Sequence, residues 1–532
     1  MKQTLATYRI VDSIAPDRIA EDLSSLGAAV RGSIRIVRSV YFDTFDWRLF
    51  AENKSLAVLS AENGEEIHFF DHGRQQTISR QTIEAAKGAL PGGFASDLPA
   101  GDLRDSLEAV IEVRRLFPRL AMTSKQWPIS VLDKEGKTIL RLRLEQLRFR
   151  KPSGGGKSGS KGGKSASLGA QLTLLPVRGY GKPFMKAKRV LDRRYKRASK
   201  AAPPHVKGLK KIGTTPGAYS SKLRLDLAPE MAAGDAARLI HLTLLETMEL
   251  NEEGTIKNLD SEFLHDFRVA VRRVRSALSQ IDKGVLPGKV TAKAKKDFRW
   301  LGQQTNHMRD LDVYLIEYPK LQAVLPKPYK PNLKPFKDYL SKQSAKENKK
   351  IAALVKGRRY RGLRDHWRAF MSDPAALEDG EYAATPIKAL ADARIWKTYR
   401  RFMKEGEAIG KDAPAEALHE LRISGKKLRY LIEFFQGLYP RKKVASLIKE
   451  QKALQNVLGE FQDAEIQSQA ILRFGREMSD AGVAPIKTQM AMGMVAESIL
   501  QLQDKAYLEF FDRFEDFSRP PIRKAFARLF KN

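Results

Sequence analysis

Two short stretches of this chain carry a histidine followed by regularly spaced arginines and lysines. The first reads HDFRVAVRRVR over residues 265–275, and the second reads HELRISGKKLRY over residues 419–430. The histidine and the first arginine are three residues apart in both stretches. Because arginine donates two parallel hydrogen bonds from its planar fork, such a pattern could bind phosphate groups.

On a helix, both stretches place their cations beside the apolar side. At about 100° per residue, apolar side chains of each stretch gather on one side and the cations form the adjacent stripe. The two patterns superimpose at an offset of 154 residues. The stripes consist of His265, Arg268, Arg272 and Arg275 in the first stretch and of His419, Arg422, Lys426 and Arg429 in the second, while Arg273 and Lys427 point elsewhere.

The segments that follow the two stretches also match each other. KKDFRWLGQQTNHMRDLDV, from Lys295, parallels IKEQKALQNVLGEFQDAEI, from Ile448, at an offset of 153. This match adds the cations Lys296, Arg299, Lys449 and Lys452 and aligns Asp310 with Asp463. We therefore predict that residues 225–532 are a duplicated four-helix unit.

The ordinary explanation of a basic stripe is a solvated helix face. Repetition at the same angle, beside the core boundary in both halves, favours a functional stripe, since long side-chain stems can pack there while their heads project into a groove. Neighbouring cations repel by ~1 kcal/mol or more per close pair at intermediate dielectric, and a bound anion would remove that cost.

The histidines and acids beside the stripes leave alternatives open. His265 and His419 are either satisfied histidines at the core edge or donors to phosphate that also hold a neighbouring carboxylate. Asp310, Asp312 and Asp463 could suggest a metal. No carboxylate or second histidine lies at i+3 or i+4 of either histidine on the same face, so we predict no metal site and no cofactor. Asp310 and Asp463 are instead expected to orient arginines of the stripes.

Composition bounds the class of partner. The chain has 532 residues, enough for two to four domains, and 95 Lys and Arg against 62 Asp and Glu give a formal net charge of +33. Such an excess indicates a polyanionic partner: nucleic acid, an anionic membrane surface or inorganic polyphosphate. The absence of cysteine, of a visible secretory signal and of a long apolar run leads us to expect a cytoplasmic protein without membrane insertion.

Two regions differ in periodicity. Residues 1–200 read as short strands, rich in β-branched and aromatic residues, with turn residues between them. The expected fold class is α+β: an antiparallel β tunnel or barrel with helices, a linker at 201–222, and an all-helical, duplicated four-helix bundle at 223–532. The Gly/Ser/Lys stretch 153–169 is expected to be a long hairpin loop. Long helices are predicted at 228–250, 260–283, 288–318, 334–371, 387–410, 413–437, 442–475 and 485–517.

The paired motifs resemble the CHAD family, the conserved-histidine α-helical domain. The matching features are HxxRVxxRRxR, LGxxxNxMRDLDV, HxLRxxxKKLRY and LQxxLGxxQD, over roughly residues 225–530. The resemblance implies two four-helix halves with a basic surface or cavity that binds inorganic polyphosphate, and targeting to polyphosphate granules. Gln462 stands where the first half has an arginine before its aspartate. The binding set implied is His265, Arg268, Arg272, Arg273, Arg275, Lys296, Arg299, His419, Arg422, Lys426, Lys427, Arg429, Lys449 and Lys452.

The N-terminal region resembles the CYTH, or triphosphate-tunnel, family through YFDTFDWRL at 41–49 and LDKEG at 132–136. The resemblance implies an eight-stranded antiparallel tunnel whose ExExK strand holds Mg²⁺ or Mn²⁺. Here that strand corresponds to LATYR, with Leu5, Thr7 and Arg9 in place of the motif. Without clustered carboxylates a hard divalent cation has no ligands. We therefore expect a catalytically inactive tunnel that has a structural role or binds an anion through Arg141, Arg143 and Arg148.

Four functions follow from these observations. The first is polyphosphate binding without catalysis. The second is a metal-dependent triphosphatase or polyphosphatase, against which the missing ExExK motif argues. The third is non-specific nucleic-acid binding, although the stripes lack the aromatic residues that stack bases, apart from Tyr430 at the edge of one. The fourth, a membrane-surface protein, lacks an apolar helix face that is free of core packing.

Overall fold

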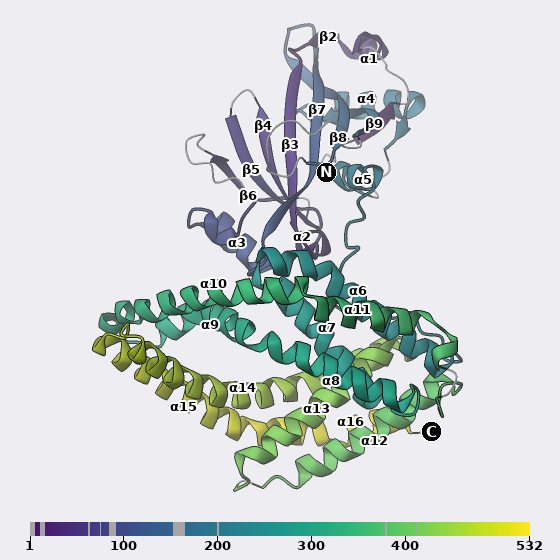
Figure 1. Cartoon of the computed structure of the whole chain (residues 1–532). Coiled ribbons are helices and arrows are strands. Elements are labelled where there is room, and N and C mark those ends of the chain that lie inside the picture. The colour runs from purple at the N-terminus through teal and green to yellow at the C-terminus, as the bar shows by residue number, and fades with distance from the viewer. Residues whose placement is uncertain are drawn as a thin grey trace. The chain divides into compact units, whose positions relative to one another are not determined.

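The computed structural model describes residues 6–10, 16–61, 64–74, 76–83, 92–152, 165–198, 202–377, 380–410 and 412–531. The chain divides into two compact units, residues 1–220 and 221–532, and each is described by itself (Figure 1). Residues 153–164 of the predicted hairpin loop lie outside the described residues. Within the described part, no helix is long and apolar enough to cross a membrane.

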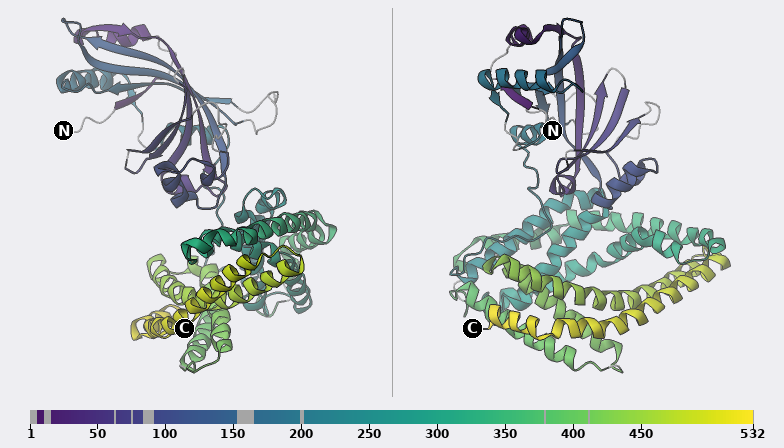
Figure 2. Two further views of the ribbon diagram at one scale, coloured as in Figure 1. Left: turned by 90° about the vertical axis from the view of Figure 1, so that its left-hand side faces the viewer. Right: turned by 180° about the vertical axis from the view of Figure 1, so that it is seen from behind.

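The N-terminal unit is built on an antiparallel sheet, as predicted, which the described residues form from ten strands. Nine of them follow the order β10-β1-β9-β8-β7-β3-β4-β5-β6, and β2 pairs with β7. Among the described strands the pairing is an open path from β10 to β6 and not a closed ring. The sheet twists strongly along its long strands (Figure 2). The strands are β1 (Ala6–Ile10), β2 (Ala28–Arg31), β3 (Arg35–Thr44), β4 (Lys54–Ala61), β5 (Gly64–Asp71), β6 (Gln76–Ile83), β7 (Leu116–Leu132), β8 (Thr138–Arg150), β9 (Ser165–Leu175) and β10 (Lys196–Arg197).

The two faces of the sheet differ because side chains alternate along each strand. One face is apolar: Tyr8, Leu142 and Leu172 share a buried core with Leu191 of α4 (Gly181–Arg194). Helix α3 (Asp102–Ile111) joins a second core with strands β3 to β5. The opposite face is polar, and there the Ser124 hydroxyl donates to the Glu145 carboxylate over 3.1 Å.

Helix α5 (Pro204–Lys211) packs on part of this polar face. Its Leu209 shares a core cluster with Leu147 and Phe149 of β8. The helix approaches so closely that a Cβ at Gly208 would lie 2.3 Å from the Phe149 ring, which requires glycine there. The stretch 201–222, predicted as a linker, therefore contains a helix that belongs to the N-terminal unit. This helix was not predicted, because its apolar residues span a short stretch flanked by prolines and glycines and do not establish a helical period.

The C-terminal unit is helical throughout its described residues (Figure 1). Its α-helices are α6 (Ala233–Lys257), α7 (Ser261–Gln280), α8 (Gly288–Gln304), α9 (Asn306–Ala323), α10 (Lys334–Lys356), α11 (Arg358–Ser372), α12 (Ile387–Glu407), α13 (Ala415–Phe435), α14 (Arg441–Asp480), α15 (Ile486–Ser518) and α16 (Pro520–Phe530).

Helix breaks distinguish the first half of this unit from the second. The helix predicted at 288–318 is two helices, α8 and α9, separated at Thr305, and the one predicted at 334–371 is interrupted at Gly357. In the second half, α14 runs unbroken for 40 residues where the first half has α8 and α9. Helix α16, which begins at Pro520, was not predicted.

The apolar cores of this unit do not follow the boundary between the predicted repeats. The larger core takes side chains from both halves, for example Phe267 of α7 and Phe402 of α12. The smaller core combines Tyr314 of α9 and Phe336 of α10 with Phe474 of α14. Each half therefore completes the other, and neither half buries its apolar side chains by itself.

Candidate functional site

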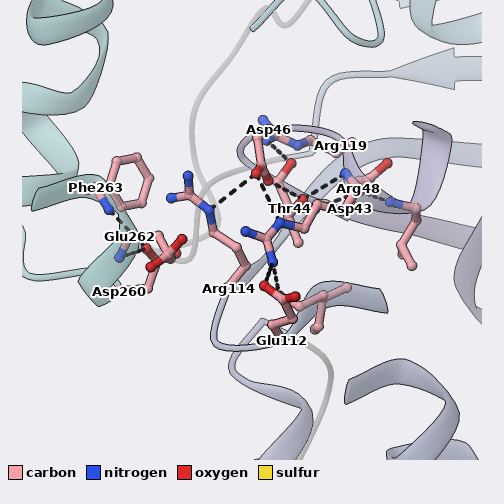
Figure 3. Close-up of polar contacts among 12 residues, drawn as sticks. Asp43, Thr44, Asp46, Arg48, Glu112, Arg114, Arg119, Asp260, Glu262 and Phe263 are labelled. Atoms are coloured by element: carbon pink, nitrogen blue, oxygen red, sulfur yellow. Dashed lines mark hydrogen bonds and ion pairs between the residues drawn. The ribbon is translucent and has the colours of Figure 1, made fainter. Parts of the chain in front are cut away.

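Helix α7 presents the first basic stripe at a defined angle because its start and its apolar side are fixed. The Asp260 carboxylate accepts from the backbone N–H groups of Glu262 (3.0 Å) and Phe263 (3.3 Å), which caps the helix (Figure 3). Phe267 and Val271 are buried in the core. The stripe therefore lies at the edge of the buried side, as the helical periodicity predicts.

Arg268 lies in this stripe and is held by the junction of α8 and α9. Its guanidinium donates to the Gly302 carbonyl (3.2 Å), the Thr305 hydroxyl (2.6 Å) and the Asn306 side chain (2.9 Å). Burial, followed by the charge of Arg272, lowers the pKa of Arg268 to about 10. All three acceptors are uncharged, so the positive charge of Arg268 is not neutralised by them.

Arg422, the equivalent residue of α13, is held by a carboxylate. Its guanidinium donates to Asp463 of α14 over 2.7 Å. His419, exposed on α13, makes a short hydrogen bond through Nδ1 with the Gln462 side chain, whose amide donates to Glu465 over 3.1 Å. His265, half-buried on α7, has interaction partners of its own.

The two stripes meet where α7 contacts α13. Burial lowers the pKa of Lys426 to about 8, with further lowering from nearby cations that include Arg272 of the other half. The carboxylate of Glu433 lies 3.5 Å from Arg273 of α7 and 3.4 Å from Arg429 of α13, so it bridges the two helices. Cations separated by 154 positions in the sequence are thus neighbours in the fold.

Two of the other predicted site residues, Arg273 and Arg275, have identified neighbours. Arg273 donates to the Ser221 carbonyl over 2.8 Å, so part of its donor capacity holds the chain. Burial lowers the pKa of Arg275 on α7, and the nearby charge of Arg299 on α8 lowers it further. The remaining cations have no side-chain hydrogen bond or ion pair among the described residues and lie at the surface or half-buried; they are Arg272, Lys296, Lys427, Lys449 and Lys452.

Several guanidinium nitrogens of the predicted binding set are buried without a hydrogen-bond acceptor in the described part of the chain. They are the Nε atoms of Arg268, Arg273, Arg422 and Arg429. A buried donor that lacks an acceptor costs roughly 1–3 kcal/mol. These unsatisfied donors add to the cost of gathering like charges at this place.

The acids beside the stripes play unequal parts. Asp463 orients Arg422 through a direct hydrogen bond, whereas Asp310 acts on Arg268 through its charge, with no hydrogen bond between them in the described residues. Burial raises the pKa of Asp312 to about 7. Within the described residues, no group of three or more His, Cys, Asp or Glu side chains could hold a metal ion.

In the N-terminal unit, the YFDTFDWRL motif builds a buried polar corner (Figure 3). The Asp43 carboxylate accepts from the backbone N–H groups of Thr44 (2.8 Å) and of Leu49 and Phe50 (both 3.0 Å). These bonds fix helix α2 (Arg48–Ala51) behind the strand. The aspartate of the motif is therefore occupied in supporting the backbone.

Two arginines that the sequence analysis did not single out complete this corner. Arg114, only 1% exposed, lies 3.5 Å from the Asp46 carboxylate. Arg119 donates to the Thr44 carbonyl over 2.6 Å and lies over the Trp47 ring at 4.7 Å. Arg114 comes just before β7 and Arg119 lies near its start, and neither belongs to a recognisable local sequence pattern. Their role is therefore seen only from their contacts with residues that are distant in the sequence.

The polar face of the sheet does not fit a divalent cation. Thr7 and Arg9 of β1 lie on it, because the alternate residue Tyr8 is buried in the apolar core, and Leu5 lies outside the described residues. Glu145 is the acid in the centre of this face, and its carboxylate lies 3.5 Å from Arg143. Glu66 of β5 lies on the same face, and its carboxylate accepts from Arg80 over 2.6 Å. Carboxylates that are already paired with arginines do not provide the oxygen ligands that Mg²⁺ requires.

The three arginines of β8 do not share one face. Arg141 and Arg143 alternate onto the polar face with Glu145, whereas Arg148 is an odd number of residues from both and lies on the opposite face. An anion site that uses all three, as the sequence suggested, is therefore excluded within this strand. Arg141 and Arg143 remain available on the polar face.

Comparison with known proteins agrees with this description. Residues 240–472 match the family model of the CHAD domain. Two uncharacterized proteins of Mycobacterium tuberculosis, Rv2226 of strain H37Rv and MT2285 of strain CDC 1551, are each 24% identical over 282 residues, which is 51% of this chain and 53% of theirs. The chain thus matches about half the length of these relatives.

Two solved structures also align. The CHAD domain from the plant Ricinus communis has 25% sequence identity and a TM-score of 0.44, covering 58% of this chain and 96% of that one. A candidate adenylate cyclase from Bacillus halodurans has 14% identity and a TM-score of 0.26, covering 38% of this chain and 94% of that one.

Residues 240–472 are accordingly a CHAD domain, and that family is linked to polyphosphate. The match includes both histidine–arginine stretches and ends within α14. The N-terminal unit resembles the CYTH family through its motif and its antiparallel sheet.

Proposed function

We propose that the helical unit binds inorganic polyphosphate along the two basic stripes. The binding set proposed is the one that the motifs indicate, centred on Arg268, Arg272, Arg422 and Lys426. The N-terminal unit is proposed to have a supporting or anion-holding role without metal-dependent catalysis, and localisation to polyphosphate granules would follow from the binding.

The observation that carries this proposal is the meeting of like charges from both halves. Arg272 and Lys426 are 154 residues apart in the sequence, yet they lie on helices α7 and α13, which contact each other. Burial lowers the pKa of Lys426, and the charge of Arg272 is among those that lower it further. A fold does not gain stability by such a contact, since it repels. A polyanion that lies across both stripes supplies the missing negative charge and also releases counterions.

A uniform phosphate chain fits the stripes better than nucleic acid does. The stripes offer donors at regular helical intervals, and Tyr430 at the edge of one is the aromatic residue near them. Its ring lies 5.3 Å from the guanidinium carbon of its neighbour Arg429. Single-strand binders usually stack bases on aromatic platforms, which the stripes do not provide.

The test measures binding of long-chain polyphosphate to the full chain over a range of salt concentrations, with DNA as competitor. The variant Arg272→Glu/Lys426→Glu reverses both meeting charges. Its matched control, Lys342→Glu/Lys346→Glu, makes the same change of net charge on exposed positions of α10. We expect the stripe variant to lose at least 100-fold in affinity and the control to lose less than threefold. Equal losses in both variants would mean that only the overall charge matters.

A second assay tests the role proposed for the N-terminal unit. The full chain is incubated with tripolyphosphate and either Mg²⁺ or Mn²⁺, and released phosphate is measured. We expect no release above the uncatalysed level, because the polar face lacks clustered carboxylates. Release that disappears in Glu145→Gln would establish the enzyme alternative and refute this part of the proposal.

A further inference from the structure

A pocket of about 740 Å³ is lined by residues of α12 and by Phe530 of α16, and no residue of the two stripes lines it. Its lining residues are Ala389, Asp392, Ala393, Trp396, Lys397, Arg400, Arg401, Lys404 and Phe530. None of them belongs to the motifs that the sequence analysis singled out. The volume falls in the range of about 300–1,000 Å³ that is usual for small-molecule sites.

The cations of this pocket form a row along one helix. Lys397, Arg400 and Lys404 are three and four residues apart, so they share a face of α12 and span about 10 Å along its axis. All three are exposed, and within the described residues none forms an ion pair with an acidic side chain. Arg401 donates to Glu405 over 2.6 Å and is the member of the set that is paired.

The acid of the pocket does not neutralise this row. Asp392 is 2% exposed, and its carboxylate accepts from Lys388 (2.6 Å) and from the Tyr439 hydroxyl (2.7 Å). Neither Lys388 nor Tyr439 belongs to the row of Lys397, Arg400 and Lys404. The pocket therefore has a net positive edge that its own residues leave unbalanced.

The same pocket has an aromatic wall. Trp396 is half-buried, and its ring stacks on Tyr399 with ring centres 5.6 Å apart and planes 29° apart. Tyr399 in turn stacks on Phe526 of α16 at 3.9 Å, which fixes α16 beside α12. The indole is thus held in place and forms the pocket wall together with the buried Phe530.

We propose that this pocket binds a nucleoside polyphosphate, with the phosphates along Lys397, Arg400 and Lys404 and the base against Trp396. Cations at helical spacing suit adjacent phosphates, and a fixed indole suits a flat aromatic ring. The stripes of α7 and α13 lack such a ring, so the two sites differ in the ligand they favour. A pocket of this volume suits a small molecule.

The test uses fluorine NMR of the full chain labelled with 5-fluorotryptophan. The chain has five tryptophans, and each is expected to give its own fluorine resonance. The Trp396→Phe variant identifies the resonance of Trp396. ATP, tripolyphosphate and adenosine are then titrated at constant ionic strength. We expect ATP to shift the Trp396 resonance at concentrations at least tenfold below those at which tripolyphosphate or adenosine shifts it.

Two variants locate the effect. Arg400→Gln/Lys404→Gln is expected to weaken ATP binding at the Trp396 resonance at least tenfold while the other four resonances keep their positions. Arg272→Glu/Lys426→Glu is expected to leave that titration unchanged, so a failure of the polyphosphate proposal would not be mistaken for a failure of this one.

Three outcomes would overturn the proposal. The first is an ATP titration that is unaffected by Arg400→Gln/Lys404→Gln. The second is equal potency of tripolyphosphate and ATP, which would make the site a plain anion site. The third is a ten-nucleotide single strand that binds tenfold more tightly than ATP at the Trp396 resonance, which would assign the pocket to nucleic acid.

Discussion

The two halves of the helical unit hold equivalent arginines by different means. Arg268 donates to the Gly302 carbonyl and the Thr305 hydroxyl at the break between α8 and α9, whereas Arg422 donates to Asp463 on the unbroken α14. The last carbonyls of a helix have no partner within it, and the negative end of its dipole favours a cation. A continuous helix has no such free carbonyls there, so the second half uses a carboxylate.

This difference teaches that the halves are unequal in charge although their motifs are alike. The groups that accept hydrogen bonds from Arg268 are uncharged, while Arg422 pairs directly with the carboxylate of Asp463. A phosphate chain should therefore be held more strongly by the first half than by the second.

The largest effect is expected from removing the anchored cation of each half without leaving a free acid. Arg268→Gln should weaken polyphosphate binding at least tenfold, because it removes an unbalanced charge and its hydrogen bonds to phosphate, roughly 1.5–3 kcal/mol for a charged donor. Arg422→Gln/Asp463→Asn removes no net charge and should cost less than threefold. Binding is measured by competition at fixed salt. The reverse order of the two losses would contradict the inequality of the halves.

A smaller effect is expected from pH, through Lys426. Its folded-state pKa of about 8 lies below the ordinary value of 10.5, so the free protein loses this charge as the pH rises through 8. We expect polyphosphate affinity to fall about threefold between pH 7 and 9.5 and the fall to be absent in Lys426→Arg. A profile that is identical in both proteins would show that Lys426 does not titrate in this range.

The same shift has an opposite effect on folding. Between pH 8 and 10.5 the unfolded chain binds the proton more tightly than the folded chain does, so stability should rise with pH in that window. Chemical denaturation of the wild-type protein and Lys426→Met across this window measures the contribution. The variant should lack this part of the pH dependence.

Asp463→Asn should increase affinity for polyphosphate about twofold to threefold, since it removes a negative charge that competes with phosphate for Arg422. Asp310→Asn should have a smaller effect, because within the described residues Arg268 makes no hydrogen bond to Asp310. Competition binding at low salt measures both. A decrease on Asp463→Asn would mean that orientation of Arg422 outweighs the charge.

The smallest effect on binding is expected at the helix break. Thr305→Val removes the hydroxyl that accepts from Arg268 over 2.6 Å and should lower the free energy of unfolding by about 1 kcal/mol, with less than a twofold change in affinity. Thr291→Val is the matched control, because its buried hydroxyl donates to the Pro287 carbonyl of the same helix and touches no arginine of the stripe. Equal losses of stability would show that the contact with Arg268 adds nothing.

The parts of the fold that depend on local periodicity were predictable. The angle of the stripes on α7 and α13 follows from 3.6 residues per turn, and the antiparallel N-terminal sheet follows from short β-branched runs. The break at Thr305 was not predictable, because no proline or glycine stands at that position and the apolar period continues through it. Helix α5 was missed because its packing against Phe149 of β8 depends on a contact between distant segments.

By itself, the sequence determined that this is a basic, two-part protein whose helical part repeats one cationic pattern at a fixed angle. Charge, composition and helical period are local properties, so they could be read without a fold. Only the tertiary structure decided that Arg272 and Lys426 meet, that Arg268 and Arg422 have different anchors, and that Lys397, Arg400 and Lys404 share a pocket with Trp396. Each of these contacts depends on how the helices pack against one another, and that packing depends on the core that both halves share.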